Sequence, residues 1–72
     1  MPKIIVYRKL GEAIASYRHF RNLSQEQLAF VVGIDRTYLA RIEVGRANPS
    51  LKVLHKVALE LEVPLNKLLE LK

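Results

Sequence analysis

Two helix-capping signals on either side of one glycine restrict the middle of this chain to two short helices and a tight turn. Ser24 is followed three residues later by Gln27, the spacing of a capping box, so a helix should begin at Gln25. Gly33 can adopt the left-handed conformation that ends a helix, and Asp35 can cap the next helix directly afterwards. The sequence therefore predicts a connecting turn of about three residues.

Apolar residues recur at helical spacing in the rest of the chain as well. A first helix ends near residues 21–22, Ser50 can cap a fourth helix, and Pro64 suits the first turn of a short fifth helix. Residues 3–7 are rich in β-branched side chains and could form an extended arm, an edge strand or an early helical turn. The residues expected to be buried are Leu10, Ala13, Ile14 and Tyr17; Leu28, Ala29 and Val32; Leu39 and Ile42; Leu51, Leu54, Val57, Ala58 and Leu61; and Leu65, Leu68 and Leu69.

The chain of 72 residues is long enough for one compact domain, which we expect to span residues 1–72, with residues 1–8 as an N-terminal arm whose structure the sequence leaves open. It has no cysteine, so it has no disulfide framework and no thiolate metal site. It also has no apolar run as long as a signal peptide core or a membrane span. We expect a cytoplasmic protein that has no membrane segment.

Catalytic and metal-binding patterns are missing from the sequence. There is no phosphate-binding loop and no histidine with a carboxylate at motif spacing, and His19 and His55 stand alone. We therefore expect no enzyme activity, no cofactor and no metal.

Positive charge is concentrated in the first two thirds of the chain. The net charge is +5 and the isoelectric point about 9.9, which favours a polyanionic partner. Residues 1–46 contain eight Lys or Arg and four acidic residues, whereas residues 47–72 contain four and three. At 100° per residue, Leu39 and Ile42 share one side of the third helix. The opposite arc is basic and holds Arg36, Thr37, Ala40, Arg41 and Val44.

Two short helices joined by a glycine-containing turn form a helix-turn-helix arrangement, which requires a small residue such as Ala29 where the helices cross. The segment SQEQLAFVVGIDRTYLARIEVGRANPSL, from Ser24 onwards, resembles the lambdoid-phage repressor and Cro family, also called the XRE family. The resemblance extends over residues 9–69, since Leu10, Gly11, Ile14, Arg18 and residues 64–69 also match. It implies an all-α, five-helix, lambda-repressor-like domain that regulates transcription by binding double-stranded operator DNA as a dimer, with helix three in the major groove.

The resemblance also implies the role of individual residues. An arginine can bond guanine O6 and N7 as a fork, and a threonine methyl group can contact thymine. Arg18 and Glu43 match an ion pair that belongs to the scaffold. The base-reading positions are Arg36, Thr37, Ala40 and Arg41, and the phosphate-contacting positions are Gln25, Tyr38, Arg46 and Asn48.

The segment IDRTYLARIEVGRANPSL is similar to the controller proteins of restriction-modification systems, which are small dimeric members of the family. Apolar residues in the last third of the chain could form a two-fold interface for a homodimer on a palindromic site. The candidates are Val53, Leu59, Leu65, Leu68, Leu69 and Leu71.

A second hypothesis belongs to a different functional class. Phe30 and Val31 stand where the family favours polar residues, and Val44 is a further apolar substitution. Together with Leu59, the apolar pair at 30 and 31 is compatible with a protein-interaction module, such as an antitoxin, that keeps the same fold.

Overall fold

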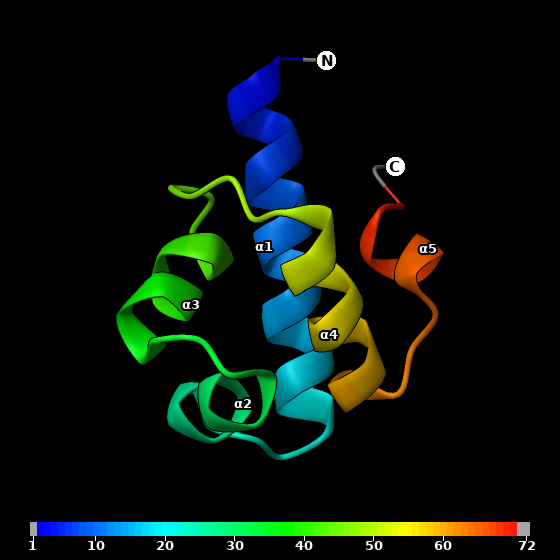
Figure 1. The fold of residues 1–72 in the computed structure, drawn as a ribbon. Coiled ribbons are helices and arrows are strands. Elements are labelled where there is room, and N and C mark those ends of the chain that lie inside the picture. The colour runs from blue at the N-terminus through cyan, green and yellow to red at the C-terminus, as the bar shows by residue number, and fades with distance from the viewer. Residues whose placement is uncertain (1, 71–72) are drawn as a thin grey trace.

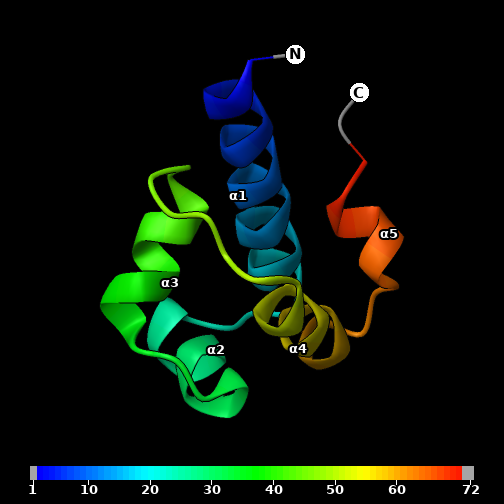
Figure 2. The same ribbon diagram turned by 45° about the horizontal axis from the view of Figure 1, so that its top comes forward.

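The computed structural model describes residues 2–70, with the backbone alone at residues 3 and 4, and within this range the chain is built from five helices. α1 runs through the middle of the molecule, and α3 and α5 lie on opposite sides of it (Figures 1 and 2). The all-α, five-helix fold that the sequence predicts is confirmed. The helices are α1 (Lys3–Phe20), α2 (Gln25–Val32), α3 (Arg36–Glu43), α4 (Leu51–Leu61) and α5 (Leu65–Leu68).

The predicted capping residues start the three middle helices. Ser24 Oγ accepts a hydrogen bond from the Gln27 backbone N–H at 3.0 Å, and the Gln27 side chain accepts one from the Ser24 N–H at 2.8 Å. Asp35 caps α3 and Ser50 caps α4 through the same kind of bond, at 2.9 and 3.1 Å. Each cap satisfies a backbone donor that the first turn leaves unpaired, so the helix start is fixed locally.

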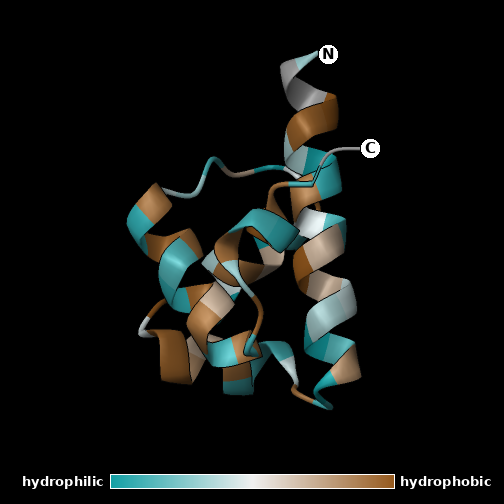
Figure 3. Cartoon of the chain, turned by 90° about the vertical axis from the view of Figure 1, so that its right-hand side faces the viewer, coloured by the Kyte–Doolittle hydropathy of each residue, from teal (hydrophilic) through white to brown (hydrophobic). Residues whose placement is uncertain are grey.

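The core forms where the apolar stripes of the helices meet. Bands of hydrophobic and hydrophilic residues alternate along the helices, as expected of amphipathic elements packed around one core (Figure 3). Ala13, Tyr17 and Leu65 are half-buried at its edge. The fully buried apolar residues are Leu10, Ile14, Leu28, Ala29, Val32, Leu39, Ile42, Leu54, Val57, Ala58, Leu61 and Leu68.

Two leucines that we expected inside the core are on the surface. Leu51 is 65% exposed because it is the first residue of α4, and the buried residues of this helix begin one turn later, at Leu54. Leu69 is 44% exposed because α5 ends at Leu68, so the helical spacing does not continue to it. Pro64 precedes α5 as its N-cap residue and does not lie in the first turn.

The residues expected at the dimer interface differ in how far they are buried. Leu68 is 0% exposed, so its selection as an interface residue was wrong: it fills the core between α5 and its neighbours. Leu59 is 63% exposed and Leu69 is partly so, whereas Val53 and Leu65 are half-buried. Leu71 lies outside the described residues.

α1 begins at Lys3, so residues 3–7 form the first turns of a helix rather than an arm or a strand. These turns extend past the other helices (Figure 1). None of the helices within residues 2–70 combines the length and the hydropathy that a membrane span requires.

Gly11 lets α1 and the end of α3 approach closely. A Cβ at this position would lie against the backbone oxygens of Ile42 and Glu43, 2.5 Å from the latter. Gly33 is different, because its φ of +84° demands a left-handed conformation but no atom lies near the site of a Cβ.

We predict that Gly11→Ala destabilises the protein more than Gly33→Ala. The clash at residue 11 outweighs the gain in helix propensity and should lower the free energy of unfolding by about 2 kcal/mol. Backbone strain alone should cost Gly33→Ala about 1 kcal/mol. Urea denaturation measures both, with exposed Ser16→Ala in α1 as the control; equal losses at 11 and 33 would contradict the close approach.

Candidate nucleic-acid interface

One side of α3 is basic and faces solvent, and its opposite side packs into the core. Leu39 and Ile42 are buried on the inner side. Arg36, Thr37 and Arg41 are exposed and Ala40 is half-buried. The two guanidinium groups therefore extend from a helix that is held in place by the core.

The turn between α2 and α3 consists of residues 33–35, because α2 ends at Val32 and α3 begins at Arg36. The N–H groups of Gly33 and Ile34 both donate to the Ala29 backbone oxygen, at 2.9 and 3.0 Å. Ala29 is buried, and its small side chain permits this close crossing of the two helices. The relative orientation of α2 and α3 is thus set within a few residues of the turn.

A buried ion pair fixes the last residue of α3 to α1. Arg18 Nε lies 2.7 Å from Glu43 Oε2, and Arg18 Nη2 donates to Glu43 Oε1 at 2.9 Å. The side chains are only 8% and 6% exposed. Arg18 Nη1 also donates to the Leu23 backbone oxygen at 2.8 Å, so the guanidinium holds the loop before α2 as well. The expected scaffold role of this pair is confirmed.

A chain of hydrogen bonds extends from this ion pair to the surface. Gln25 Nε2 donates to Glu43 Oε1 at 3.0 Å, and Gln25 Oε1 accepts from Arg36 Nη1 at 3.4 Å. This link was not predicted, because Gln25 and Arg36 are each the first residue of a different helix and meet only where the two helices cross. The Gln25 amide thus connects a buried carboxylate to an exposed guanidinium.

Of the remaining predicted phosphate contacts, Arg46 and Asn48 lie in the loop after α3, whereas Tyr38 lies in the first turn of α3. Arg46 and Asn48 are exposed in this loop, and Arg41 Nη2 donates to the Arg46 backbone oxygen at 3.3 Å. Tyr38 is half-buried and packs against the core, so most of its ring serves the scaffold. The structure therefore brings Arg41 and Arg46 together and leaves Tyr38 as the most enclosed member of the set.

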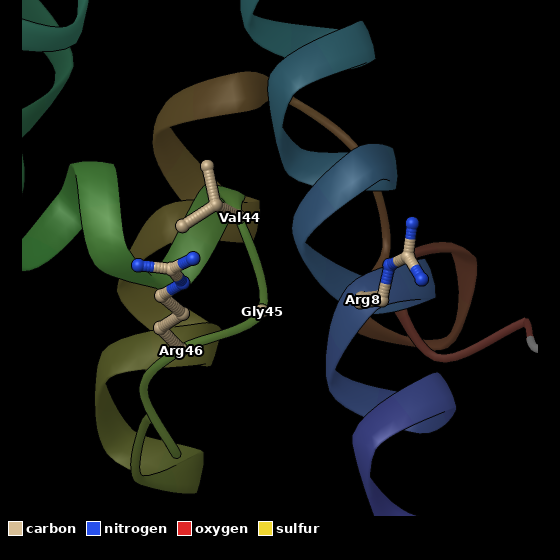
Figure 4. A pocket seen from close by; sticks show the side chains of 4 residues that line it. All are labelled: Arg8, Val44, Gly45 and Arg46. Carbon is tan, nitrogen blue, oxygen red and sulfur yellow. The ribbon is translucent and has the colours of Figure 1, made fainter.

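One basic residue near this loop was not among the predicted site residues. Arg8 in α1 lines a surface hollow of about 460 Å³ with Val44, Gly45 and Arg46. Arg8 and Arg46 extend on opposite sides of the loop at Gly45 (Figure 4). Arg8 falls just outside the segment that carries the family resemblance, and only the tertiary packing of α1 on the loop shows its position.

Metal-binding groups do not gather in the part of the chain that the structure describes. Within residues 2–70, no three His, Cys, Asp or Glu side chains lie close enough to share a metal ion. His19 Nε2 lies 3.4 Å from Arg18 Nη2, beside the buried ion pair.

A family model described as helix-turn-helix matches residues 14–68. The chain belongs to this family, the XRE family of transcriptional regulators. This helix-turn-helix protein is similar to the control protein C.SmaI of Serratia marcescens, with 43% identity over 60 residues that cover 83% of this chain and 71% of that protein.

Solved structures agree with the assignment. The restriction-modification controller protein C.AhdI from Aeromonas hydrophila has a TM-score of 0.84 and 37% identity, covering 86% of this chain and 94% of that one. The biofilm master regulator SinR, crystallised in complex with DNA, has a TM-score of 0.81 and 35% identity, covering 85% and 98%. SinR comes from Bacillus subtilis. The helix-turn-helix protein thus shares its fold with proteins that regulate transcription.

We predict that Glu43→Gln lowers the free energy of unfolding by about 3 kcal/mol, because it leaves the Arg18 charge buried without a counter-charge. Glu60→Gln, at an exposed acidic residue of α4, is the control and should change stability by less than about 0.5 kcal/mol. The double variant Arg18→Met with Glu43→Leu should lose less than Glu43→Gln, since no charge then remains buried. Urea denaturation of the three variants tests the pair, and a double variant that loses as much stability as Glu43→Gln would contradict it.

Proposed function

We propose that this regulator binds specific DNA sequences by inserting α3 into the major groove. The observation that carries the proposal is the pair of exposed guanidinium groups of Arg36 and Arg41 on a helix whose other side is buried. A rigid helix with such an arc fits the width of the B-DNA major groove. The similarity to SinR, which was crystallised in complex with DNA, supports DNA as the ligand.

Each residue of the arc has a chemical role in this proposal. Arg36 and Arg41 donate two hydrogen bonds each to guanine O6 and N7. Thr37 places its methyl group against the methyl group of thymine. Ala40 has no side chain beyond Cβ, so the helix backbone can approach the base edges closely. The Gln25 amide steadies the Arg36 guanidinium before DNA binds.

The DNA backbone is held beside the groove by groups at the two ends of the motif. Arg46 and Asn48 in the loop after α3, together with the Tyr38 hydroxyl, donate to phosphate oxygens. Gln25 contributes the backbone N–H at the start of α2, where the helix dipole favours an anion. These contacts orient α3 but do not distinguish sequences.

A homodimer on a palindromic site extends the proposal. Two recognition helices must lie about 34 Å apart to enter successive major grooves on one face of the duplex. The largest extent of one protomer is 31 Å. α3 and α5 lie on opposite sides of α1, so two copies joined through α4 and α5 direct their α3 helices outwards (Figure 2). Leu59 and Leu69 supply the exposed apolar area on that side.

Replacing either arginine should remove sequence discrimination. Binding sites are first selected from a random duplex library, and fluorescence anisotropy then compares a selected site with a site changed at one base pair. Arg36→Ala and Arg41→Ala should each lose about 1 to 3 kcal/mol of discrimination, the value of a bidentate contact. Lys56→Ala, an exposed charge on α4, should lose none. Unchanged discrimination in both arginine variants contradicts groove reading by α3.

Replacing Leu59 should weaken self-association. Leu59→Asp puts a charge into the proposed interface, so sedimentation equilibrium should show monomers at concentrations where the parent is dimeric. Phe30→Asp is the matched control, because Phe30 is also an exposed apolar residue but lies on α2. A Leu59 variant that associates like the parent rejects this interface.

The second candidate function is a protein-interaction module that keeps this fold. It is favoured by Phe30, which is 83% exposed, and by its exposed neighbour Val31. If the Arg36 and Arg41 variants bind DNA as the parent does, this surface on α2 becomes the better candidate for function.

A further inference from the structure

The N-terminal part of α1 reaches the loop that follows α3. Gly45 in this loop has a φ of +78°, and a Cβ there would lie 2.8 Å from Arg8 Cα and 2.9 Å from Arg8 N. The loop therefore rests directly on the α1 backbone at Arg8, which positions this residue relative to the loop. Both Arg8 and Arg46 line the hollow that results (Figure 4).

The hollow begins directly after the end of α3. Val44, the residue that follows α3, is exposed and lines the hollow. Arg41, on the outer arc of α3, donates to the Arg46 backbone oxygen. Exposed arginines therefore lie on the outer arc of α3, in the loop that follows it and on α1, with Val44 and Gly45 between them.

Neither Arg8 nor Arg46 forms an ion pair with an acidic side chain that the structure describes within residues 2–70. Arg18, Arg21 and Lys67 are cations in this part of the chain that do form ion pairs. Glu12 and Glu43 line the adjoining hollow, but Glu43 is already neutralised by Arg18. Glu12 is then the one unneutralised acid lining either hollow, against two exposed guanidinium groups.

We propose that Arg8 binds a phosphate of the duplex next to the groove that α3 occupies, on the other side of the Gly45 loop from Arg46. This inference rests on the proposed function and extends the DNA contact from the helix-turn-helix motif to the N-terminal turns of α1. The exposed guanidinium group of Arg8 offers hydrogen-bond donors and no acceptor, which matches a phosphodiester rather than a base edge. Arg8 adds affinity for DNA of any sequence and no base preference.

The salt dependence of binding tests the role of Arg8. Anisotropy titrations of the selected site and of a scrambled duplex are made between 50 and 200 mM salt, with the full chain. Arg8→Ala should lower the slope of log K against log salt by about 0.9 per protomer, the value of one phosphate contact. The ratio of selected to scrambled affinity should stay the same, and Arg8→Lys should keep the parent slope.

Lys56→Ala is the matched control, since it removes the same charge from an exposed position on α4. Its slope should equal that of the parent. The inference is overturned if Arg8→Ala keeps the parent slope, if Lys56→Ala lowers the slope equally, or if Arg8→Ala alters discrimination. Failure of the proposed function gives a different result. Either the parent protein shows no sequence preference, or the Arg36 and Arg41 variants discriminate between sequences as well as the parent does. Far-ultraviolet circular dichroism verifies that each variant is folded.

Discussion

The buried pair of Arg18 and Glu43 sets the geometry on which the interface depends. Glu43 ends α3, and its two carboxylate oxygens bind a guanidinium that extends from α1 and also holds the Leu23 backbone. Such a pair adds little net stability over an apolar one, but losing one partner costs several kcal/mol. It therefore restricts the chain to one arrangement of α1, α2 and α3, and Gly11 permits the close contact which that arrangement needs.

The same pair links stability to recognition. Glu43 also accepts from Gln25, and Gln25 accepts from Arg36, so a buried carboxylate restrains a side chain that faces solvent. A restrained arginine loses less side-chain entropy when it bonds a base, because part of that freedom is already absent before binding. A change at Glu43 should consequently affect DNA recognition as well as folding, even though Glu43 itself is buried.

The sequence predicts what depends on neighbours in the chain, and misses what depends on tertiary contacts. The caps at Ser24, Asp35 and Ser50 are local, and they are where the sequence puts them. Helical spacing assigned Leu51 and Leu69 to the core because periodicity does not show where an apolar surface ends. The Gln25 link and the position of Arg8 arise only when α3 and its following loop pack against other helices, so no local pattern could indicate them.

The distribution of acids explains why the basic surface needs a partner. Within residues 2–70 the ion-paired acids are Glu43, Glu62 and Glu70, and their partners Arg18, Arg21 and Lys67 lie outside the outer arc of α3. The arginines of α3 and of its following loop have only neutral partners, a glutamine side chain and a backbone oxygen. Their mutual repulsion remains in the free protein, and in the proposed complex phosphates replace the water and counterions around them and relieve it. The buried charge of the scaffold is thus neutralised internally by the Arg18–Glu43 pair, whereas the arginines that face the proposed ligand have no acidic partner among the residues that the structure describes.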